Sequence, residues 1–368
     1  MVKILFLIHD LGPGGAEKVL VNLVNNMDPT KFDITVMALF GGGVNEQFLK
    51  PHIKYKKIFK HSIPGNSKIM KCFSAEHLHQ FCVREHYDIE VSYLEGPSAR
   101  IISGCQDKST KLVSWIHIEQ HTKKKASESF RNYTEATKCY LKFDRTICVS
   151  ASVKKDFESI FTLKRPAEVL YNTNESSHIL EMAKDEVDVF SDDEFKVIGV
   201  GKILPNKGFD RLARIHCQLI DDGYRVHTYV LGDGRQREEI TSFITKRHAE
   251  NTFTFLGYQT NPYKYVANAD LFVCASHAEG FSTAATEALI VGTPVCTVEV
   301  SGMKEMLGEH NEWGVVTKNS DEDLKQGIKY FLESPDFMAH YKEKAVERGQ
   351  TFNTETTVKA VEDMLLKL

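Results

Sequence analysis

The stretch CASHAEGFSTAATEALIVGTPV, from Cys274 to Val295, decides the fold of the chain around it. The apolar run DLFVCAS (270–276) leads into it, and a short run of this kind predicts a buried strand. Residues 286–291 have the pattern of a helix body, and Gly292 supplies the stop signal expected just after a helix. The segment therefore predicts a strand, a glycine turn, a helix and a second strand.

Two carboxylates lie eight residues apart in this segment. Glu279 is expected at the turn, and Glu287 about two turns into the helix at ~1.5 Å rise per residue. The N-terminus of a helix offers free N–H groups that suit a phosphate. An ionised carboxylate only accepts hydrogen bonds, so it suits sugar hydroxyls. The pair is the first candidate for a site that binds both a phosphate and a sugar.

Short apolar runs alternate with helical patterns on both sides of this segment. Such runs predict parallel sheets covered on both faces, and thus an α/β chain of two doubly wound, Rossmann-like domains. Ligands of these folds bind at the carboxyl ends of the strands, which here are expected to face a cleft between the domains. The expected strands are 3–8, 32–39, 89–94, 111–117 and 145–150, then 195–201, 225–232, 252–257, 270–276 and 293–300.

The length of 368 residues also favours two domains. The acidic, polar stretch at 181–194 interrupts the alternation and is expected to mark the boundary. We therefore expect a first domain over 1–180 and a second over 181–353.

The segment around the two glutamates resembles the donor-site signature of family 4 glycosyltransferases, which are retaining enzymes of the GT-B fold. That signature has a strand ending in serine, then E-G-F, E-A and G-x-P-V, and this chain has Ser276, 279–281, 287–288 and 292–295 at those places. Ser282 replaces the usual proline after E-G-F. The resemblance also implies that a last helix, at about 354–368, packs back on the first domain.

The resemblance assigns roles to five residues of the segment. It implies that Glu279 binds the donor sugar and that Glu287 accepts hydrogen bonds from the ribose. It further implies that the donor site is lined by Gly280, Phe281 and Ser282.

The loop GVGKILPNKGFDRL (199–212) follows a predicted strand and precedes a predicted helix. Lys202 and Lys207 could neutralise a diphosphate leaving group there, as a metal does in other transferases. The family has basic residues at both places, which implies that both lysines hold the donor diphosphate beside Gly201. No D-x-D motif follows a predicted strand, so neither a metal nor another cofactor is expected.

Two more glycine turns follow predicted strands. In LGDGRQREEI, Gly232 and Gly234 match a loop that lines the nucleotide pocket in the family, although a lone G-x-G is a weak signal. In HDLGPGGAEKVL, Gly14 and Gly15 could bring N–H groups to a phosphate or could form only a tight turn.

His117 ends the predicted strand KLVSWIH. The family carries a histidine in a W-x-H context at this strand end, so the resemblance implies that His117 contacts the donor sugar or the reaction centre.

Composition limits the possible partners and compartments. No apolar run reaches the ~18 residues that span a bilayer, and the eight cysteines form no C-x-x-C pair. A reducing, cytoplasmic compartment without disulfides or structural zinc is therefore expected.

Residues 1–180 have 25 Lys and Arg against 19 Asp and Glu, a net charge of +6, whereas the rest has 21 against 31, a net of −10. The basic half could contact an anionic membrane peripherally, on the inner face of the plasma membrane, or could simply be solvated. No nucleic-acid motif accompanies the charge.

We interpret the chain as a retaining, metal-independent glycosyltransferase of bacterial polysaccharide synthesis. The expected donor is a nucleoside diphosphate sugar, a UDP-sugar, that gives a hexose or N-acetylhexosamine to a glycan or polyprenyl-diphosphate-linked acceptor. Two alternatives stay open from the sequence. One is another Rossmann-type enzyme, an epimerase or a dehydrogenase, and the other is an inactive nucleotide-sugar-binding scaffold.

Overall fold

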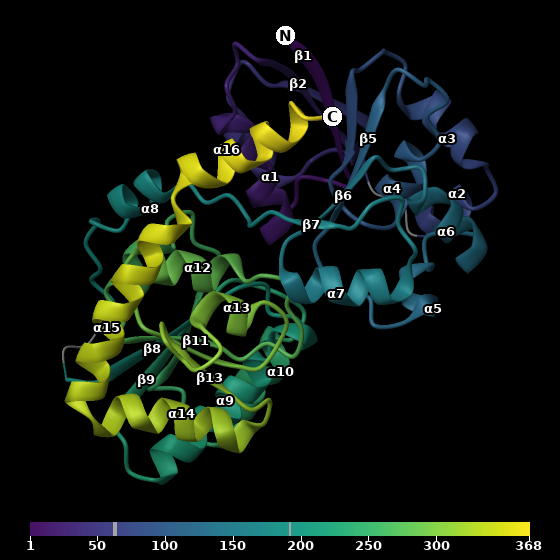
Figure 1. The fold of residues 1–368 in the computed structure, drawn as a ribbon. Coiled ribbons are helices and arrows are strands. Elements are labelled where there is room, and N and C mark those ends of the chain that lie inside the picture. The colour runs from purple at the N-terminus through teal and green to yellow at the C-terminus, as the bar shows by residue number, and fades with distance from the viewer. Residues whose placement is uncertain (62–64, 191–192) are drawn as a thin grey trace. The chain divides into compact units, whose positions relative to one another are not determined.

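The computed structural model describes residues 1–61, 65–190 and 193–368. These residues form two compact units (Figure 1), Met1–Thr173 with Glu355–Leu368, and Asn174–Thr354. The second unit begins at Asn174 and not at residue 181, because α8 (Ser176–Met182) packs on α11 (Tyr263–Ala267) and α12 (Thr283–Ile290) of that unit. Of the acidic stretch expected at the boundary, residues 191–192 lie outside the described residues.

The first unit contains a parallel sheet in the order β3-β2-β1-β4-β5-β6-β7. Its strands are β1 (Val2–Ile8), β2 (Phe32–Phe40), β3 (Lys54–Phe59), β4 (Ile89–Ser92), β5 (Lys111–Ile116), β6 (Arg145–Cys148) and β7 (Glu168–Val169). Its helices are α1 (Gly15–Asn26), η1 (Val44–Phe48), α2 (Asn66–Met70), α3 (Ala75–Cys82), α4 (Pro97–Ile102), α5 (Lys123–Ala126), α6 (Tyr133–Tyr140), α7 (Ala151–Ile160) and α16 (Thr354–Leu365), the last beginning at the unit boundary.

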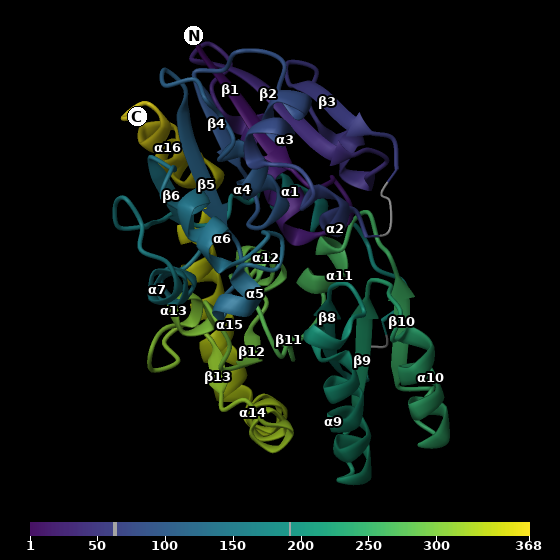
Figure 2. The same ribbon diagram turned by 90° about the vertical axis from the view of Figure 1, so that its right-hand side faces the viewer.

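The second unit contains a parallel sheet in the order β10-β9-β8-β11-β12-β13, and Figure 2 shows its strands in this order. They are β8 (Phe195–Val200), β9 (Val226–Leu231), β10 (Phe253–Gly257), β11 (Leu271–Cys274), β12 (Val295–Val298) and β13 (Val315–Thr317). The other helices of this unit are η2 (Pro205–Lys207), α9 (Phe209–Asp221), α10 (Arg237–Lys246), α13 (Met303–Leu307), α14 (Asp321–Glu333), α15 (Pro335–Gly349) and η3 (Gln350–Phe352).

The ten expected strands are all present, and both sheets are parallel, so the predicted α/β architecture of two Rossmann-like units is confirmed. Two edge strands, β3 and β13, were missed. The sequence KYKKIF of β3 contains three lysines, and the strand lies half-exposed at the edge of its sheet. It therefore lacks the apolar run by which the central strands were recognised.

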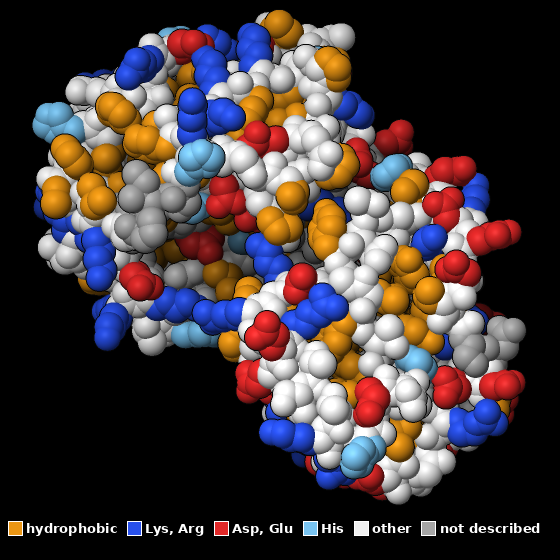
Figure 3. Space-filling model, turned by 180° about the vertical axis from the view of Figure 1, so that it is seen from behind, with side chains coloured by type: hydrophobic (Ala, Val, Ile, Leu, Met, Phe, Trp, Pro, Cys, Tyr) orange, Lys and Arg blue, Asp and Glu red, His pale blue; other side chains and the backbone are white. Residues whose placement is uncertain are grey.

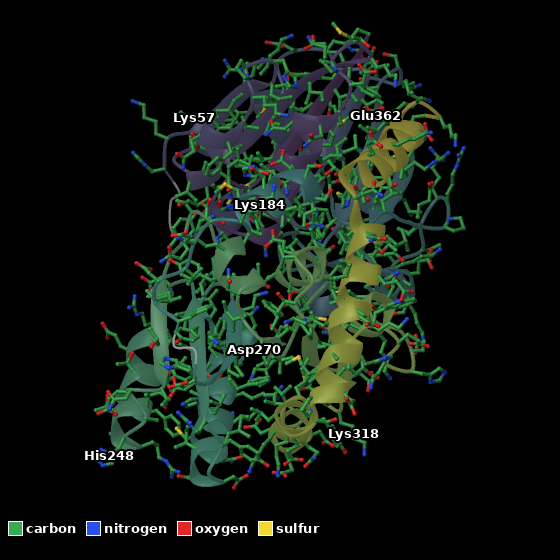
Figure 4. The ribbon with its side chains drawn as sticks, turned by 90° about the vertical axis from the view of Figure 1, so that its left-hand side faces the viewer. Lys57, Lys184, His248, Asp270, Lys318 and Glu362 are labelled. Atoms are coloured by element: carbon green, nitrogen blue, oxygen red, sulfur yellow. The ribbon has the colours of Figure 1, made fainter. Side chains whose placement is uncertain are left out.

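Burial explains why the central strands are so apolar. Residues 4–8 of β1 are fully buried, and β4, β11 and β12 are buried along their whole length. Because all strands of a sheet run in one direction, their carboxyl ends share one edge. At the amino ends of the strands of the second sheet, Asp270 (labelled in Figure 4) accepts a 2.8 Å hydrogen bond from the Lys196 N–H at the start of β8.

The C-terminal helix belongs to the first unit. Glu362 of α16, labelled in Figure 4, accepts a 2.6 Å hydrogen bond from the Asp28 N–H. The same carboxylate pairs with Lys31 at 3.4 Å, so it fixes α16 to the turn between α1 and β2. Across the described part of the chain, no helix combines the length and the apolar character that crossing a membrane requires. All eight cysteines are free thiols.

Candidate active site

Three loops meet at the carboxyl edge of the second sheet, after β8, β9 and β11. The Ile203 N–H donates to the Asp233 carbonyl at 2.9 Å and joins the first two loops. The His277 N–H donates to the Asn206 carbonyl at 2.8 Å and joins the third loop to the first. Segments that are some 70 residues apart in the sequence thus form one main-chain framework.

Glycines permit the close approach of these loops. Gly232 has a φ of 131°, and a Cβ there would lie 1.9 Å from the Gly201 carbonyl oxygen. Gly208 has a φ of 66°, and a Cβ there would lie 2.0 Å from the Ala275 carbonyl oxygen. A Cβ on Gly234 would also meet a main-chain oxygen, at 2.4 Å. These glycines therefore have a packing role that needs no ligand.

Lys207 and Glu279 form an ion pair within this framework. The Lys207 Nζ donates to Glu279 Oε1 at 2.7 Å, and the Ser276 Oγ donates to the same oxygen at 2.6 Å. The side chains of Lys207 and Glu279 are 29% and 9% exposed. Burial alone would lower the pKa of Lys207, but the charge of Glu279 and its hydrogen bond raise the pKa above the ordinary value. Oε2 of Glu279 has no partner among the described side chains, so it can still accept a hydrogen bond.

Ser276 was quoted as part of the motif but was not predicted as a site residue. Its position at the end of the strand 270–276, three residues before Glu279, was the available signal. The role follows from the structure, because two donors share one carboxylate oxygen and so fix the orientation of the other.

Lys202 lies on the same loop as Lys207 and is half-buried. No hydrogen bond or ion pair of its ammonium group occurs among the described residues. The loop therefore offers one positive charge that Glu279 compensates and one that is uncompensated. An anion would gain from both, because electrostatic attraction strengthens as water is excluded.

The helix after the glycine turn begins as its sequence requires. Ser282 is its N-cap, and its Oγ accepts a 3.3 Å hydrogen bond from the Ala285 N–H. Because α12 begins at residue 283, Glu287 lies little more than one turn into it, so the expected two turns were wrong. Glu287 is only 6% exposed and already has an interaction within the chain.

Gly280 and Phe281 form the turn between Glu279 and α12. The Phe281 ring is buried and packs edge-on against Phe352 with centroids 6.1 Å apart. The Gly280 carbonyl accepts a 3.4 Å hydrogen bond from the Ser301 Oγ. The phenylalanine thus anchors the turn in the core of the unit.

A cation and an aromatic ring stand beside the Gly232–Gly234 turn. The Arg237 guanidinium lies over the Phe255 ring, 5.6 Å from its centroid. The same guanidinium pairs with Asp233 at 3.5 Å. Arg237 was not among the predicted site residues. Its place in GDGRQREEI, just after the glycines, was the signal.

Gly14, Gly15 and His117 belong to the first unit. Gly14 is the N-cap of α1, and a Cβ there would lie 1.9 Å from Oε2 of Glu17. A carboxylate therefore already faces the N-terminus of α1. Phosphate binding by Gly14 and Gly15 stays a prediction, and it requires Glu17 to move aside.

His117 follows β5. Its N–H donates to Oε2 of Glu95 at 3.0 Å, and its ring lies 4.9 Å from that of Tyr93. Nε2 is buried and has no partner among the described residues. Burial lowers the pKa of His117 to about 3, against the effect of a hydrogen bond with the Tyr93 backbone. A ring that is neutral at pH 7 can exchange hydrogen bonds with a ligand but carries no charge.

Two family models match the chain. "Glycosyltransferase Family 4" matches residues 13–173, and "Glycosyl transferases group 1" matches residues 182–348. Together they cover most of both units.

The matched proteins include enzymes of bacterial glycan assembly. The N-acetylgalactosamine-N,N'-diacetylbacillosaminyl-diphospho-undecaprenol 4-alpha-N-acetylgalactosaminyltransferase of Campylobacter jejuni is 27% identical, over 96% of each chain. The lipopolysaccharide core biosynthesis glycosyltransferase LpsD of Rhizobium meliloti is 22% identical, over 98% of this chain and 96% of its own. HepE of Anabaena, solved in complex with UDP and glucose, superposes with a TM-score of 0.79 at 20% identity over 100% of both chains. TarM of S. aureus does so with a TM-score of 0.77 at 14% identity, over 99% of this chain and 98% of its own. The GT-B fold is thereby confirmed.

Proposed function

The chain belongs to glycosyltransferase family 4, and we propose that it transfers a hexose or N-acetylhexosamine from a UDP-sugar to a lipid-linked or glycan acceptor in bacterial polysaccharide synthesis, with retention of configuration. One observation carries the proposal. Lys207 and Ser276 both donate to Oε1 of Glu279, which leaves Oε2 for a sugar hydroxyl beside a diphosphate-binding lysine.

Each charged group has a role in this reaction. Lys202 and Lys207 compensate the charge that develops on the diphosphate as the bond from the anomeric carbon to the phosphate oxygen breaks. Oε2 of Glu279 accepts a hydrogen bond from the donor sugar, and Glu287 accepts from the ribose. The departing phosphate oxygen takes the proton of the acceptor hydroxyl, which forms the new bond on the same face. His117 stays neutral and serves the sugar as a hydrogen-bonding partner.

Two lines support UDP as the donor nucleotide. HepE, which shares the fold, was solved with UDP, with UDP and glucose, and with UDP-glucose. In this chain, Arg237 over the Phe255 ring gives a flat, cationic surface of the kind that stacks on a base. Because the lysines supply the positive charge, we expect transfer to need no metal and EDTA to leave the rate unchanged.

A lipid-linked acceptor would place the enzyme at a membrane. The acceptor named for the Campylobacter relative carries a diphospho-undecaprenol. In the first unit, β3 presents lysines at the sheet edge, although Lys54 pairs with Asp33 at 2.6 Å and Lys56 with Glu85 at 2.5 Å. Exposed aromatic side chains accompany them, Phe59 and Phe81 with rings 6.1 Å apart. Figure 3 shows lysine and arginine side chains among hydrophobic ones on this face of the unit. We propose peripheral attachment to an anionic leaflet.

The donor is tested by incubating the full chain with UDP-, GDP- and ADP-sugars. We expect thermal stabilisation by UDP-sugars and slow hydrolysis that releases UDP, both unchanged by EDTA. NMR of the product anomer checks retention. Stabilisation by GDP- or ADP-sugars alone would overturn the choice of UDP.

Attachment is tested separately, by sedimentation with anionic and neutral liposomes at low salt and at ~0.5 M salt. We expect binding to anionic liposomes only, with release by salt. Equal sedimentation with neutral liposomes would contradict the electrostatic model.

A further inference from the structure

Three possible metal ligands converge in the first unit. They are His79 of α3, Glu90 of β4 and Cys105, which lies beyond the end of α4. Their ligand atoms all lie within 4.8 Å of one another, and the His79 Nε2 is 2.8 Å from Glu90 Oε2. The spacing in the sequence forms no metal motif, so only the fold brings the three together.

The cluster lies near the amino ends of the strands, whereas His117 lies at their carboxyl ends. Glu90 is the second residue of β4 and is paired in register with Leu112, near the start of β5. His117 follows the end of β5. A ligand at the cluster would therefore be remote from the residues of this unit that were assigned to the donor.

A cavity of about 240 Å³ opens on the cluster and is lined by all three side chains. Glu90 itself is 2% exposed, so its carboxylate lies almost wholly out of water. The His86 ring and the Asp107 carboxylate also line the cavity and supply further polar atoms. His86 Nδ1 lies 3.0 Å from Asp107 Oδ2. The site is thus accessible from one side and enclosed on the other.

We propose that His79, Glu90 and Cys105 bind a divalent cation of intermediate softness, with Zn²⁺ as the best match. Zinc takes nitrogen, sulfur and carboxylate ligands at about 2.0–2.3 Å in a tetrahedron, so the ligand atoms around it lie roughly 3–4 Å apart. The observed spread within 4.8 Å requires only small side-chain movements. The cavity leaves room for water as the fourth ligand. The cation would join α3, β4 and the segment after α4 and would act on stability, not on sugar transfer.

The competing explanation is a plain ion pair between His79 and Glu90. Burial would lower the pKa of His79, but hydrogen bonds to Cys105 and Glu90 raise it to about 9. A protonated imidazole would then neutralise the buried carboxylate without any metal. Cys105 separates the two explanations, because a thiolate is a strong zinc ligand, whereas the 2.8 Å contact between His79 and Glu90 does not involve the thiol.

The test uses the full chain, stripped with EDTA and then given ZnCl₂. We expect one tightly bound equivalent per chain and a rise in Tm, and we expect Co²⁺ to show the absorption of a thiolate-to-metal charge transfer. Cys105→Ala should remove that absorption and weaken binding by at least tenfold, while the ion pair keeps the variant folded. Cys72→Ala is the matched control, because Cys72 is an exposed thiol outside the cluster.

Several results would overturn the proposal. They are binding that Cys105→Ala leaves unchanged, a Co²⁺ spectrum without thiolate character, and a Tm that Zn²⁺ does not raise in the wild-type chain. Sugar transfer should be the same with and without the cation. If no sugar transfer were detected, that result would contradict the proposed function and not the cation site.

Discussion

Replacing Lys207 by methionine separates the two roles that the structure gives this residue. In the folded chain it pairs with Glu279, whose side chain is 9% exposed. Removing one partner of a fully buried pair costs ~3–5 kcal/mol. Lys207 is itself 29% exposed, so water screens the pair, and we expect a loss of about 2 kcal/mol in the free energy of unfolding. If the ammonium also stabilises the departing diphosphate, transfer should fall by roughly 10²–10³.

A double variant distinguishes stability from catalysis. In Lys207→Met with Glu279→Gln, no unpaired charge is left in the site, so most of the lost stability should return. The rate should stay low, because the positive charge is still missing. Urea unfolding gives the stability, and initial rates with saturating donor give the transfer.

Lys196→Met is the matched control. Lys196 lies in the same sheet at its opposite edge, where its Nζ is 4.0 Å from Asp270. Its removal should cost stability but leave the rate unchanged. If Lys207→Met kept transfer within about threefold of wild type, the lysine would be only the ion-pair partner of Glu279, and the assigned chemistry would be wrong.

Three further changes test other contacts of the site. Ser276→Ala removes the hydroxyl that donates to Glu279 Oε1 at 2.6 Å and should lower kcat/KM about tenfold, with little effect on nucleotide affinity. His117→Asn should also lower transfer about tenfold. Since the pKa of His117 falls from its usual 6.5 to about 3, the unfolded chain takes up the proton first. Wild-type stability should therefore decline as pH drops from about 6.5 towards 3, and the variant should lose this part of the decline. Gly208→Ala adds a Cβ 2.0 Å from a main-chain oxygen, at a φ of 66°. It should lower the free energy of unfolding by more than about 2 kcal/mol, whereas Gly223→Ala, where the Cβ meets open space, should cost only the backbone strain, about 1 kcal/mol.

The central strands could be predicted because their burial on both faces leaves long apolar runs in the sequence. The edge strand β3 could not be predicted in this way, since half of its side chains are exposed to water and the strand contains three lysines. β13 has only three residues, too few for a periodic signal. The depth of Glu287 in α12 was overestimated, because the helix begins only at Thr283, where the Ser282 side chain caps it.

The site shows a different limit. The motif pointed to Glu279 and Lys207 separately, but the bond between them spans 72 positions and exists only because the loops after β8 and β11 pack main chain to main chain. That packing also explains Gly232 and Gly234, which the sequence suggested as ligand-binding glycines. Since close packing alone accounts for those glycines, they carry little information about a ligand.

The charged side chains indicate a donor site more directly than the glycines do. A carboxylate that is nine-tenths buried needs hydrogen bonds on both oxygens, or it loses hydration without compensation. In Glu279 one oxygen accepts from Lys207, from Ser276 and, at 3.9 Å, from the Cys274 thiol, and the other oxygen accepts from none of the described residues. Lys202 is likewise a half-buried residue whose ammonium group has no partner among the described residues. Glu279 Oε2 can accept a hydrogen bond from a hydroxyl, and the Lys202 ammonium on a neighbouring loop can bind an anion. A nucleoside diphosphate sugar has both hydroxyls and phosphate oxygens, so it can bind both groups at once.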